Sequence, residues 1–532
     1  MPVAAIRNMV QGGGVNRDQS PDDLSPNAWS NIINGRFSRN RIERFGGDEL
    51  YQNATTTPSV ANARVIEDIV RNGSEGFVLI TDSQIFLDIG AGYQDFSPVV
   101  TIQDSEDWIL TQYGDWIILT VIEGVQEPLV LGPLDSQFRP FTNWRAGFQV
   151  TKIFPYKNFL IAIGVEENNN PQNGLVFWSD VVNEDILADV AWDPADPTTL
   201  AGENVLPSAD GLIRDGGVLR DSGILYTDTS VWRMDVGNAT AGAFPLVFNF
   251  RLIFNDDGIL RTRCFTEVNG RHYVVGLYDI YVHDGFNKQS ISDNRMTEFF
   301  FESLGTGNFA FVAHYQRPQE IIISYSTGTN QAANAAIVYN YFYDTFTTLE
   351  ASPLTTGYTR LILGVEFVQD VLTWEDAQTM GLTWAQVNSI TWNSLFPQSR
   401  ERIPIVLVPG RSELFFIDRN TNSSTAVDLF IERRDLDLDS FFEDSNNTVI
   451  HLKRFVPQVT GDGLITIQFG GRNVLGQPII WDPERTYDLL TNFKFDMRVS
   501  YRYPAIRIQQ GQDGNAFRMT GYDLVARSVG RR

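Results

Sequence analysis

A pair of short apolar strands joined by a polar turn recurs along the first two thirds of the chain. Its copies begin near residues 76, 115, 158, 222, 271 and 320, so most steps are about 40–50 residues long. A hairpin of this size cannot bury both faces alone, and repeats at this spacing bury them against their neighbours. The spacing therefore predicts a mainly β protein, with an irregular β-propeller of about six to eight blades over residues 60–370. A row of β-sandwiches would show similar hairpins and is the alternative.

Three further segments flank this region. Residues 1–59 are expected to form a separate N-terminal segment, and strand patterns in residues 401–532 predict a β-sandwich-like domain that packs with it. Residues 371–400 differ, because three Thr-Trp pairs form a short internal repeat. Each threonine can cap a helical turn that its tryptophan anchors, so we expect a short Trp-rich insertion. Besides forming local core, its tryptophans could form a platform for a ligand or partner: Trp374, Trp384 and Trp392.

Charge is distributed unevenly along the 532 residues. Acidic residues outnumber basic ones by 65 to 41, a formal net charge of −24, which disfavours a surface that grips nucleic acid or anionic lipid. Yet residues 1–45 hold six arginines against four acids, and residues 498–532 hold seven against two. Arginine suits pairing with carboxylates at interfaces, although a genomic bias would also enrich it. The candidate interface residues are therefore arginines of the two basic ends: Arg36, Arg39, Arg41, Arg44, Arg527 and Arg531.

Residue patterns typical of catalysis are missing from the sequence. The sequence offers few ligands for a metal site, because it has a single cysteine, Cys264, and four histidines without i, i+4 spacing. Neither a phosphate-binding P-loop nor a Gly-x-Ser-x-Gly motif occurs. The segment Asp435–Asp439 resembles the start of a calcium loop, but Ser440 stands where the loop requires glycine, so a half-buried strand is the better interpretation. We expect no enzyme activity and no cofactor.

Several short motifs occur in an order that is more specific than any of them alone. Together with the Trp-rich insertion they are Asn8–Asp18, Ser20–Trp29, Asn34–Phe37, Ile42–Gly46, Phe177–Asp180, Leu225–Trp232, Tyr281–Gly285 and Gly521–Arg527. In these motifs and their order the chain resembles the nozzle proteins of short-tailed bacteriophages, also called tail tubular protein B or tail hub proteins. The resemblance covers most of the chain, which is shorter than some relatives.

The resemblance implies a structural virion protein in the phage tail. It implies a homo-hexamer below the head-to-tail adaptor ring, a central channel that the double-stranded DNA crosses during ejection, and a platform for tail fibres or spikes. In this role residues 1–59 would be the docking platform, and the arginines of the two basic ends are the predicted docking residues for the adaptor. The three tryptophans of the insertion are then candidates for a distal gate or a fibre contact. No transmembrane or secretory segment is recognisable in the sequence, so we expect synthesis in the host bacterial cytoplasm. The alternatives are a carbohydrate-binding or receptor-binding fibre or spike component and, less favoured, a propeller-fold glycoside hydrolase.

Overall fold

The fold is mainly β, as predicted. The computed structural model describes residues 3–7, 14–52, 63–89, 92–105, 107–122, 126–183, 187–207, 211–237, 240–241, 244–245, 247–329, 332–350, 360–365, 402–407, 414–419, 428–438, 449–511 and 517–529. In these residues the helical elements are α1 (Thr297–Ser303) and the 3₁₀ turn η2 (Leu187–Asp189). The predicted Trp-rich insertion lies outside the described residues.

Seven units of four antiparallel strands make up the larger part of the described chain. The first three are β6 (Ala63–Arg71), β7 (Ser74–Thr81), β8 (Ile85–Asp88) and β9 (Gln94–Asp95); β10 (Trp108–Tyr113), β11 (Trp116–Val121), β12 (Leu129–Leu131) and β13 (Arg139–Pro140); and β14 (Phe148–Tyr156), β15 (Phe159–Glu167), β17 (Leu175–Trp178) and β18 (Gly202–Val205), with β16 (Asn170–Pro171) beside β15.

The next three units also consist of consecutive strands, apart from the small hairpin β22 (Thr240–Ala241) and β23 (Phe244–Pro245) within the fourth. They are β19 (Asp215–Leu219), β20 (Ser222–Tyr226), β21 (Val231–Val236) and β24 (Phe248–Phe254); β25 (Phe265–Val268), β26 (Arg271–Val275), β27 (Ile280–His283) and β28 (Lys288–Ser290); and β29 (Ala310–Tyr315), β30 (Glu320–Tyr325), β31 (Ala335–Asn340) and β32 (Thr345–Glu350).

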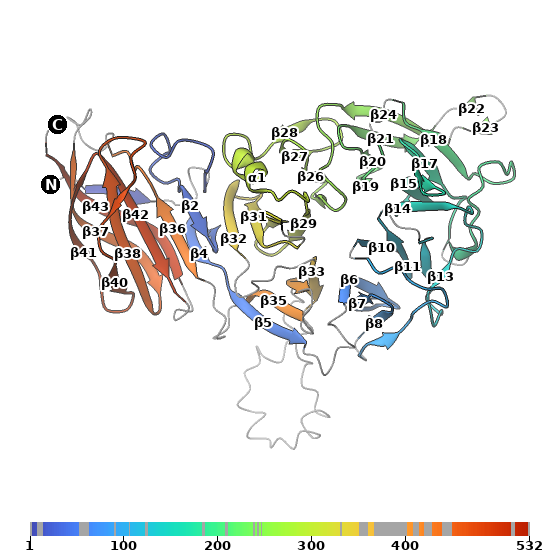
Figure 1. The fold of residues 1–532 in the computed structure, drawn as a ribbon, viewed down its shortest axis with the longest axis horizontal. Coiled ribbons are helices and arrows are strands. Elements are labelled where there is room, and N and C mark those ends of the chain that lie inside the picture. The colour runs from blue at the N-terminus through green and yellow to red at the C-terminus, as the bar shows by residue number, and fades with distance from the viewer. Residues whose placement is uncertain are drawn as a thin grey trace, which may run out of the picture.

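The seventh unit combines strands from distant parts of the sequence. It contains β33 (Arg360–Val365), β34 (Arg402–Leu407), β35 (Leu414–Arg419) and, paired with β35, β5 (Gly47–Gln52). The domain boundary predicted at residue 401 therefore falls inside a sheet, and so does part of the segment 1–59. The seven units follow one another around a ring in Figure 1, which is a propeller-like arrangement.

Arg263, which lies just before β25, contacts four of the seven units. Its guanidinium forms an ion pair with Glu67 of β6 at 2.7 Å and donates to the carbonyl of Trp108 on β10. The backbone N–H of Arg263 donates to the carboxylate of Asp215 on β19 at 2.7 Å. Its backbone carbonyl accepts from the N–H of Val312 on β29 at 2.9 Å. One residue thus joins the first strands of four units across the ring.

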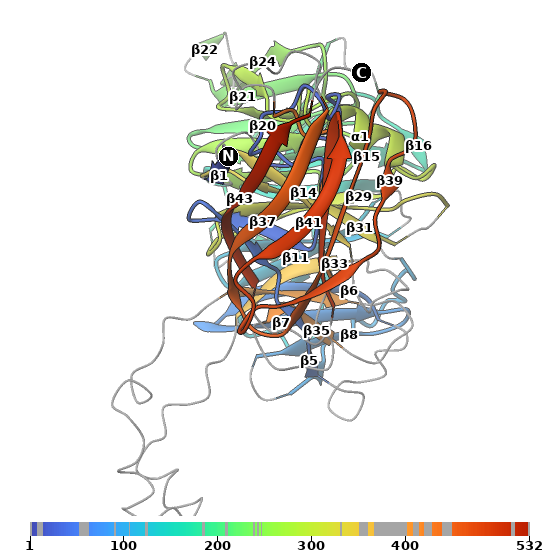
Figure 2. The same cartoon turned by 90° about the vertical axis from the view of Figure 1, so that its left-hand side faces the viewer.

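The remaining strands form two sheets that face each other in a sandwich-like lobe. One sheet contains β1 (Val3–Arg7), β3 (Gly35–Ser38), β4 (Arg41–Arg44), β43 (Phe517–Ser528), β37 (Ile450–Gly461) and β41 (Phe495–Tyr501), several of which lie side by side in Figure 2. The other contains β2 (Asn31–Ile33), β36 (Leu429–Arg433), β42 (Tyr503–Gln510), β38 (Leu464–Arg472), β39 (Ile480–Trp481) and β40 (Arg485–Asp488).

Alternating burial explains why these strands pack as two layers. Every second residue of β41 is buried, as a strand with one face on a core requires. Phe469 of β38 contacts Phe455 and Phe495 of the opposite sheet, with ring centroids 5.3 Å and 5.5 Å apart. Such aromatic pairs add to the free energy of burying their surface.

Strand β2 joins the lobe to the ring. Ile33 pairs in parallel with Thr348 of β32, while Ile32 pairs with Ile431 of β36. The sixth unit and one sheet of the lobe are therefore parts of one ten-stranded sheet, with β2 between them (Figure 1).

Asn34 stabilises this junction directly after β2. It is buried, has φ +60°, and connects the two neighbours of β2 through its side chain. The amide Nδ2 donates to the carbonyl of Asp428 at 2.9 Å, and Oδ1 accepts from the N–H of Glu350 at 3.0 Å. Asparagine tolerates this left-handed backbone better than most residues, so local conformation and long-range bonding favour the same residue.

We expect Asn34→Ala to lower the free energy of unfolding by about 2–3 kcal/mol, because two backbone groups lose a partner and alanine must adopt a positive φ. Denaturant unfolding followed by tryptophan fluorescence measures this loss. Asn308→Ala is the matched control, since Asn308 is exposed and also has a positive φ, +49°. Equal losses in the two variants would show that backbone strain alone is responsible and that the side-chain bonds of Asn34 contribute nothing.

Candidate functional site

The hairpin of β3 and β4 presents arginines beside the junction. Phe37 and Ile42 pair across the strands and point into the core, which leaves their neighbours on the other face. Its two turn residues, Arg39 and Asn40, have φ of +47° and +62°, as in the primed turns that suit two-residue hairpins. Arg39 consequently stands exposed at the tip.

A pocket of about 400 Å³ lies against this hairpin. We call it the arginine pocket, because six arginines line it and the acidic residues of its lining are Glu43 and Asp418. The six are Arg36, Arg39, Arg41, Arg44, Arg317 and Arg518. The structure thus brings together four of the predicted docking residues and adds two, in a chain whose net charge is strongly negative.

Arg36 forms the inner wall of the arginine pocket and is largely buried. Its Nη2 lies 2.6 Å from Asp418 of β35 and 3.1 Å from Glu320 of β30, and its guanidinium lies 4.1 Å from the ring centroid of Phe45. Burial opposes its charge, but the two carboxylates hold the pKa of Arg36 above its ordinary value. Arg36 therefore joins the lobe to the sixth and seventh units.

Glu320 shares that guanidinium with Asp418. Burial raises the pKa of Glu320 to about 7, and the charge of Arg36 only partly offsets this effect. A carboxyl whose pKa rises from its ordinary 4.5 on folding stabilises the folded state fully at low pH, and this contribution is lost as the pH increases through 7.

We expect the free energy of unfolding to decrease between pH 5 and pH 8 less in Glu320→Gln than in the wild type, since glutamine keeps the shape but cannot ionise. Denaturant titrations at several pH values measure the slope. Glu350→Gln changes an exposed glutamate on β32 and should retain the wild-type slope. Identical slopes in all three proteins would contradict the titration assigned to Glu320.

Three arginines of the arginine pocket, Arg39, Arg41 and Arg518, are more exposed than Arg36. Arg41 pairs with Glu43, and Arg518 of β43 lies 3.7 Å from the same carboxylate. Among the described residues the Arg39 guanidinium has no ion-pair partner. Guanidinium groups bind planar oxyanions through two parallel hydrogen bonds, so the arginine pocket is suited to carboxylate or phosphate groups.

The other predicted site residues are not part of this pocket. Arg527 is exposed on β43, but nine residues from Arg518, which is about 30 Å along a strand. The last docking candidate and the three gate candidates lie outside the described residues: Arg531, Trp374, Trp384 and Trp392.

Two of the lining arginines were not among the predicted docking residues. Arg518 belongs to the C-terminal excess of arginine and could have been chosen from that count. Arg317 lies in the turn between β29 and β30, and nothing local in the sequence places it beside the N-terminal hairpin.

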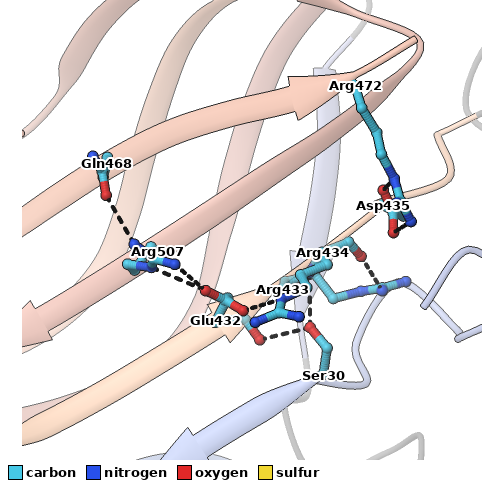
Figure 3. A network of polar contacts seen from close by, with 8 residues as sticks. All are labelled: Ser30, Glu432, Arg433, Arg434, Asp435, Gln468, Arg472 and Arg507. Atoms are coloured by element: carbon cyan, nitrogen blue, oxygen red, sulfur yellow. Dashed lines mark hydrogen bonds and ion pairs between the residues drawn. The ribbon is translucent and has the colours of Figure 1, made fainter. Parts of the chain in front are cut away.

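A second cluster of arginines, shown in Figure 3, lies in the lobe around Glu432. The carboxylate of Glu432 is buried; its Oε2 accepts from Arg507 at 2.6 Å and 2.9 Å, and its Oε1 accepts from Arg434. Ser30 of the N-terminal segment donates to the carbonyl of Glu432 and accepts from the N–H of Arg434. The buried Arg433 donates to the carbonyls of two residues in the same segment, Pro21 and Leu24.

The Asp-Leu repeat expected to form a half-buried strand is not one in its described part, residues 435–438. Asp435 has φ +47° and is buried against Arg472, with Oδ1 accepting from Nε at 2.7 Å. The buried leucines Leu436 and Leu438 explain the apolar half of the pattern. The expectation was wrong because the ion pair with Arg472 favours a bend at Asp435.

Two of the four histidines form a buried network with Tyr226. The tyrosine Oη lies 2.7 Å from Nδ1 of His272 and 2.6 Å from Nε2 of His283. Burial lowers the pKa of His272 to about 4 and that of His283 to about 3, so both are neutral near pH 7. The network links the fourth and fifth units. No group of three or more potential metal ligands occurs in the described residues.

In the part of the chain that the structure describes, no helix is long and apolar enough to span a membrane.

Comparisons with known proteins give no family. No protein-family model and no curated protein matches the chain. Solved structures with limited similarity include Citrobacter koseri AztD, with 10% identity, a TM-score of 0.30 and coverage of 60% of this chain and 73% of that chain. Another is the AfRom2 CNH domain, with 10% identity, a TM-score of 0.29 and coverage of 55% and 94%. These scores are too low to support an argument, and the description of the fold rests on its own strand pairing.

Proposed function

We propose that the chain is a structural subunit of the tail nozzle of a short-tailed bacteriophage, without enzyme activity. In this role a homo-hexamer sits below the head-to-tail adaptor, encloses the channel for genome ejection and carries tail fibres or spikes. The order of the sequence motifs suggests the family. The observation that supports docking is the arginine pocket, which collects arginines from both ends of an acidic chain.

The separation of charge within the subunit also supports a docking role for the lobe. Residues 1–46 hold six basic and four acidic residues, and residues 428–532 hold fourteen of each, so the intervening residues 47–427 carry a formal −26. We call residues 47–427 the acidic body. An acidic adaptor face would be repelled by the acidic body and attracted to the arginine pocket, which orients the subunit on the adaptor.

The acidic body suits the wall of a DNA channel. Six copies of the whole chain would carry a formal charge of −144, and like charge on the wall and the phosphates lets DNA slide without binding. Arg263 ties together the first strands of four of the seven units of the propeller-like ring. The proposed channel therefore runs between subunits rather than through each of them.

Negative-stain electron microscopy of the purified protein, alone and mixed with the adaptor ring of its phage, tests the proposed function. We expect six-fold rings with a central hole in at least the mixture. Monomers or trimers that never join the adaptor would contradict the proposal. Binding or hydrolysis of glycans by such particles would favour the fibre or hydrolase alternative.

Within that function we expect a double variant, Arg39→Gln with Arg518→Gln, to bind the adaptor at least about tenfold more weakly. It lacks two exposed guanidinium groups that can pair with carboxylates. Its affinity should also depend less on salt concentration. Arg36 is unsuitable for this test because it joins three sheets.

The matched control is Arg498→Gln, an exposed arginine on β41 of the same lobe, which should bind normally. Titration of fluorescent subunit with adaptor at two salt concentrations gives both quantities. Unchanged affinity in the double variant would exclude the arginine pocket as the docking site.

A further inference from the structure

The sandwich lobe ends in an exposed surface that none of the preceding functions uses. Strand β39 is the last strand on the main path of the ten-stranded sheet, and among the described residues it pairs only with β38. Ile480 of β39 is 62% exposed, and Val474 in the preceding turn is 56% exposed. Together with the adjacent Leu475, which is 40% exposed, these residues form what we call the edge surface.

A pocket of about 430 Å³ lies at the same sheet edge, on the face to which Trp481 points; the side chain of Ile480 points to the opposite face of β39. Trp481 and three arginines of the second cluster line the pocket: Arg434, Arg472 and Arg507. Glu432 and Asp435 hold these arginines from below, and the Arg507 guanidinium lies 4.2 Å from the ring centroid of Trp481. The guanidinium groups are therefore held in place before any partner binds, which lowers the entropy cost of binding.

Arg434 is the member of this cluster with the most donor capacity left. Its Nε donates to Glu432, its side chain is 51% exposed, and its Nη groups donate to no acceptor among the described residues. A fork of this kind attracts a carboxylate. The edge surface and the neighbouring pocket together present exposed apolar side chains, an open strand edge and cationic groups. This composition is typical of a protein contact.

We infer that the edge surface contacts the acidic body of a second copy of this chain. The complementary partner is present in the same molecule, since the acidic body carries −26 while the segments that form the lobe carry a formal +2. Two different surfaces then meet, and such a heterologous contact generates a closed ring or an open filament. The inference names the contact that the proposed hexamer needs, so it rests on the proposed function.

Sedimentation of the protein alone, over a concentration series at low and high salt, measures this contact. We expect Ile480→Asp to raise the dissociation constant between copies at least about tenfold, because a carboxylate replaces an apolar contact and faces acidic residues. Val529→Asp is the matched control: Val529 is 53% exposed and follows β43 in the opposite sheet. It should associate as the wild type does, and high salt should weaken association of both.

Cross-linking gives a second measurement that does not depend on affinity. Cys264 is buried, so a cysteine at position 480 would be the reactive thiol of Ile480→Cys and could carry a photo-reactive group. We expect cross-links to peptides of residues 63–350 of another copy. The same group on Ser528→Cys, on the opposite sheet, should give none of these products.

Each result decides between the two proposals. A protein that stays monomeric at low salt, an association unchanged by Ile480→Asp, or cross-links from position 480 to another sandwich lobe would overturn the edge contact. Six-fold rings on the adaptor would still support the nozzle in those cases. Failure of both experiments would remove the proposed function as well.

Discussion

The insertion of β2 between β32 and β36 is the contact on which the rest of the molecule depends. A strand of three residues contributes a parallel pairing to one neighbour and an antiparallel pairing to the other, so ring and lobe share one sheet. Asn34 then adopts a positive φ, and β3 and β4 follow at once in the other sheet of the lobe. The position of the arginine pocket is therefore a consequence of how the N-terminal segment closes the fold, because Arg36 can reach Glu320 and Asp418 only from this place.

In both arginine clusters, buried carboxylates offset the cost of placing several guanidinium groups close together. Guanidinium groups that crowd one wall repel each other, and burial adds a desolvation cost. In each cluster buried carboxylates below the arginines offset these costs: Glu320 and Asp418 below Arg36, Glu432 below Arg507. The inner arginines are thereby structural, while the exposed ones above them retain donors for a partner. For this reason only some of the arginines that line such a pocket are available to bind a partner.

The sequence allowed the class and the repeat to be predicted because both are local properties. The recurring hairpins that begin near residues 76, 115, 158, 222, 271 and 320 include the second strands of the first six units, from β7 to β30. The seventh unit left no such signal, since β5 and β35 meet from opposite ends of the chain. Contacts between distant parts of the sequence also explain why the arginine pocket was only partly predicted. The arginines of one hairpin were recognised together, whereas Arg317 and Asp418 join them only through tertiary structure, and the Asp-Leu repeat was misinterpreted because its partner Arg472 lies far along the sequence.

Charge separation gives the two parts of the subunit different tasks under the proposed function. The acidic body repels both DNA and other acidic surfaces, so it needs no sequence-specific feature to keep a channel open. The lobe contributes five of the six arginines of the arginine pocket, the three arginines of the pocket beside Trp481 and an open strand edge. An open strand edge invites unwanted association unless something covers it. Attraction is thus confined to one part of a molecule that is otherwise repulsive. A subunit built in this way can bind a partner or a neighbouring copy in few orientations, because nearly every other approach brings like charges together.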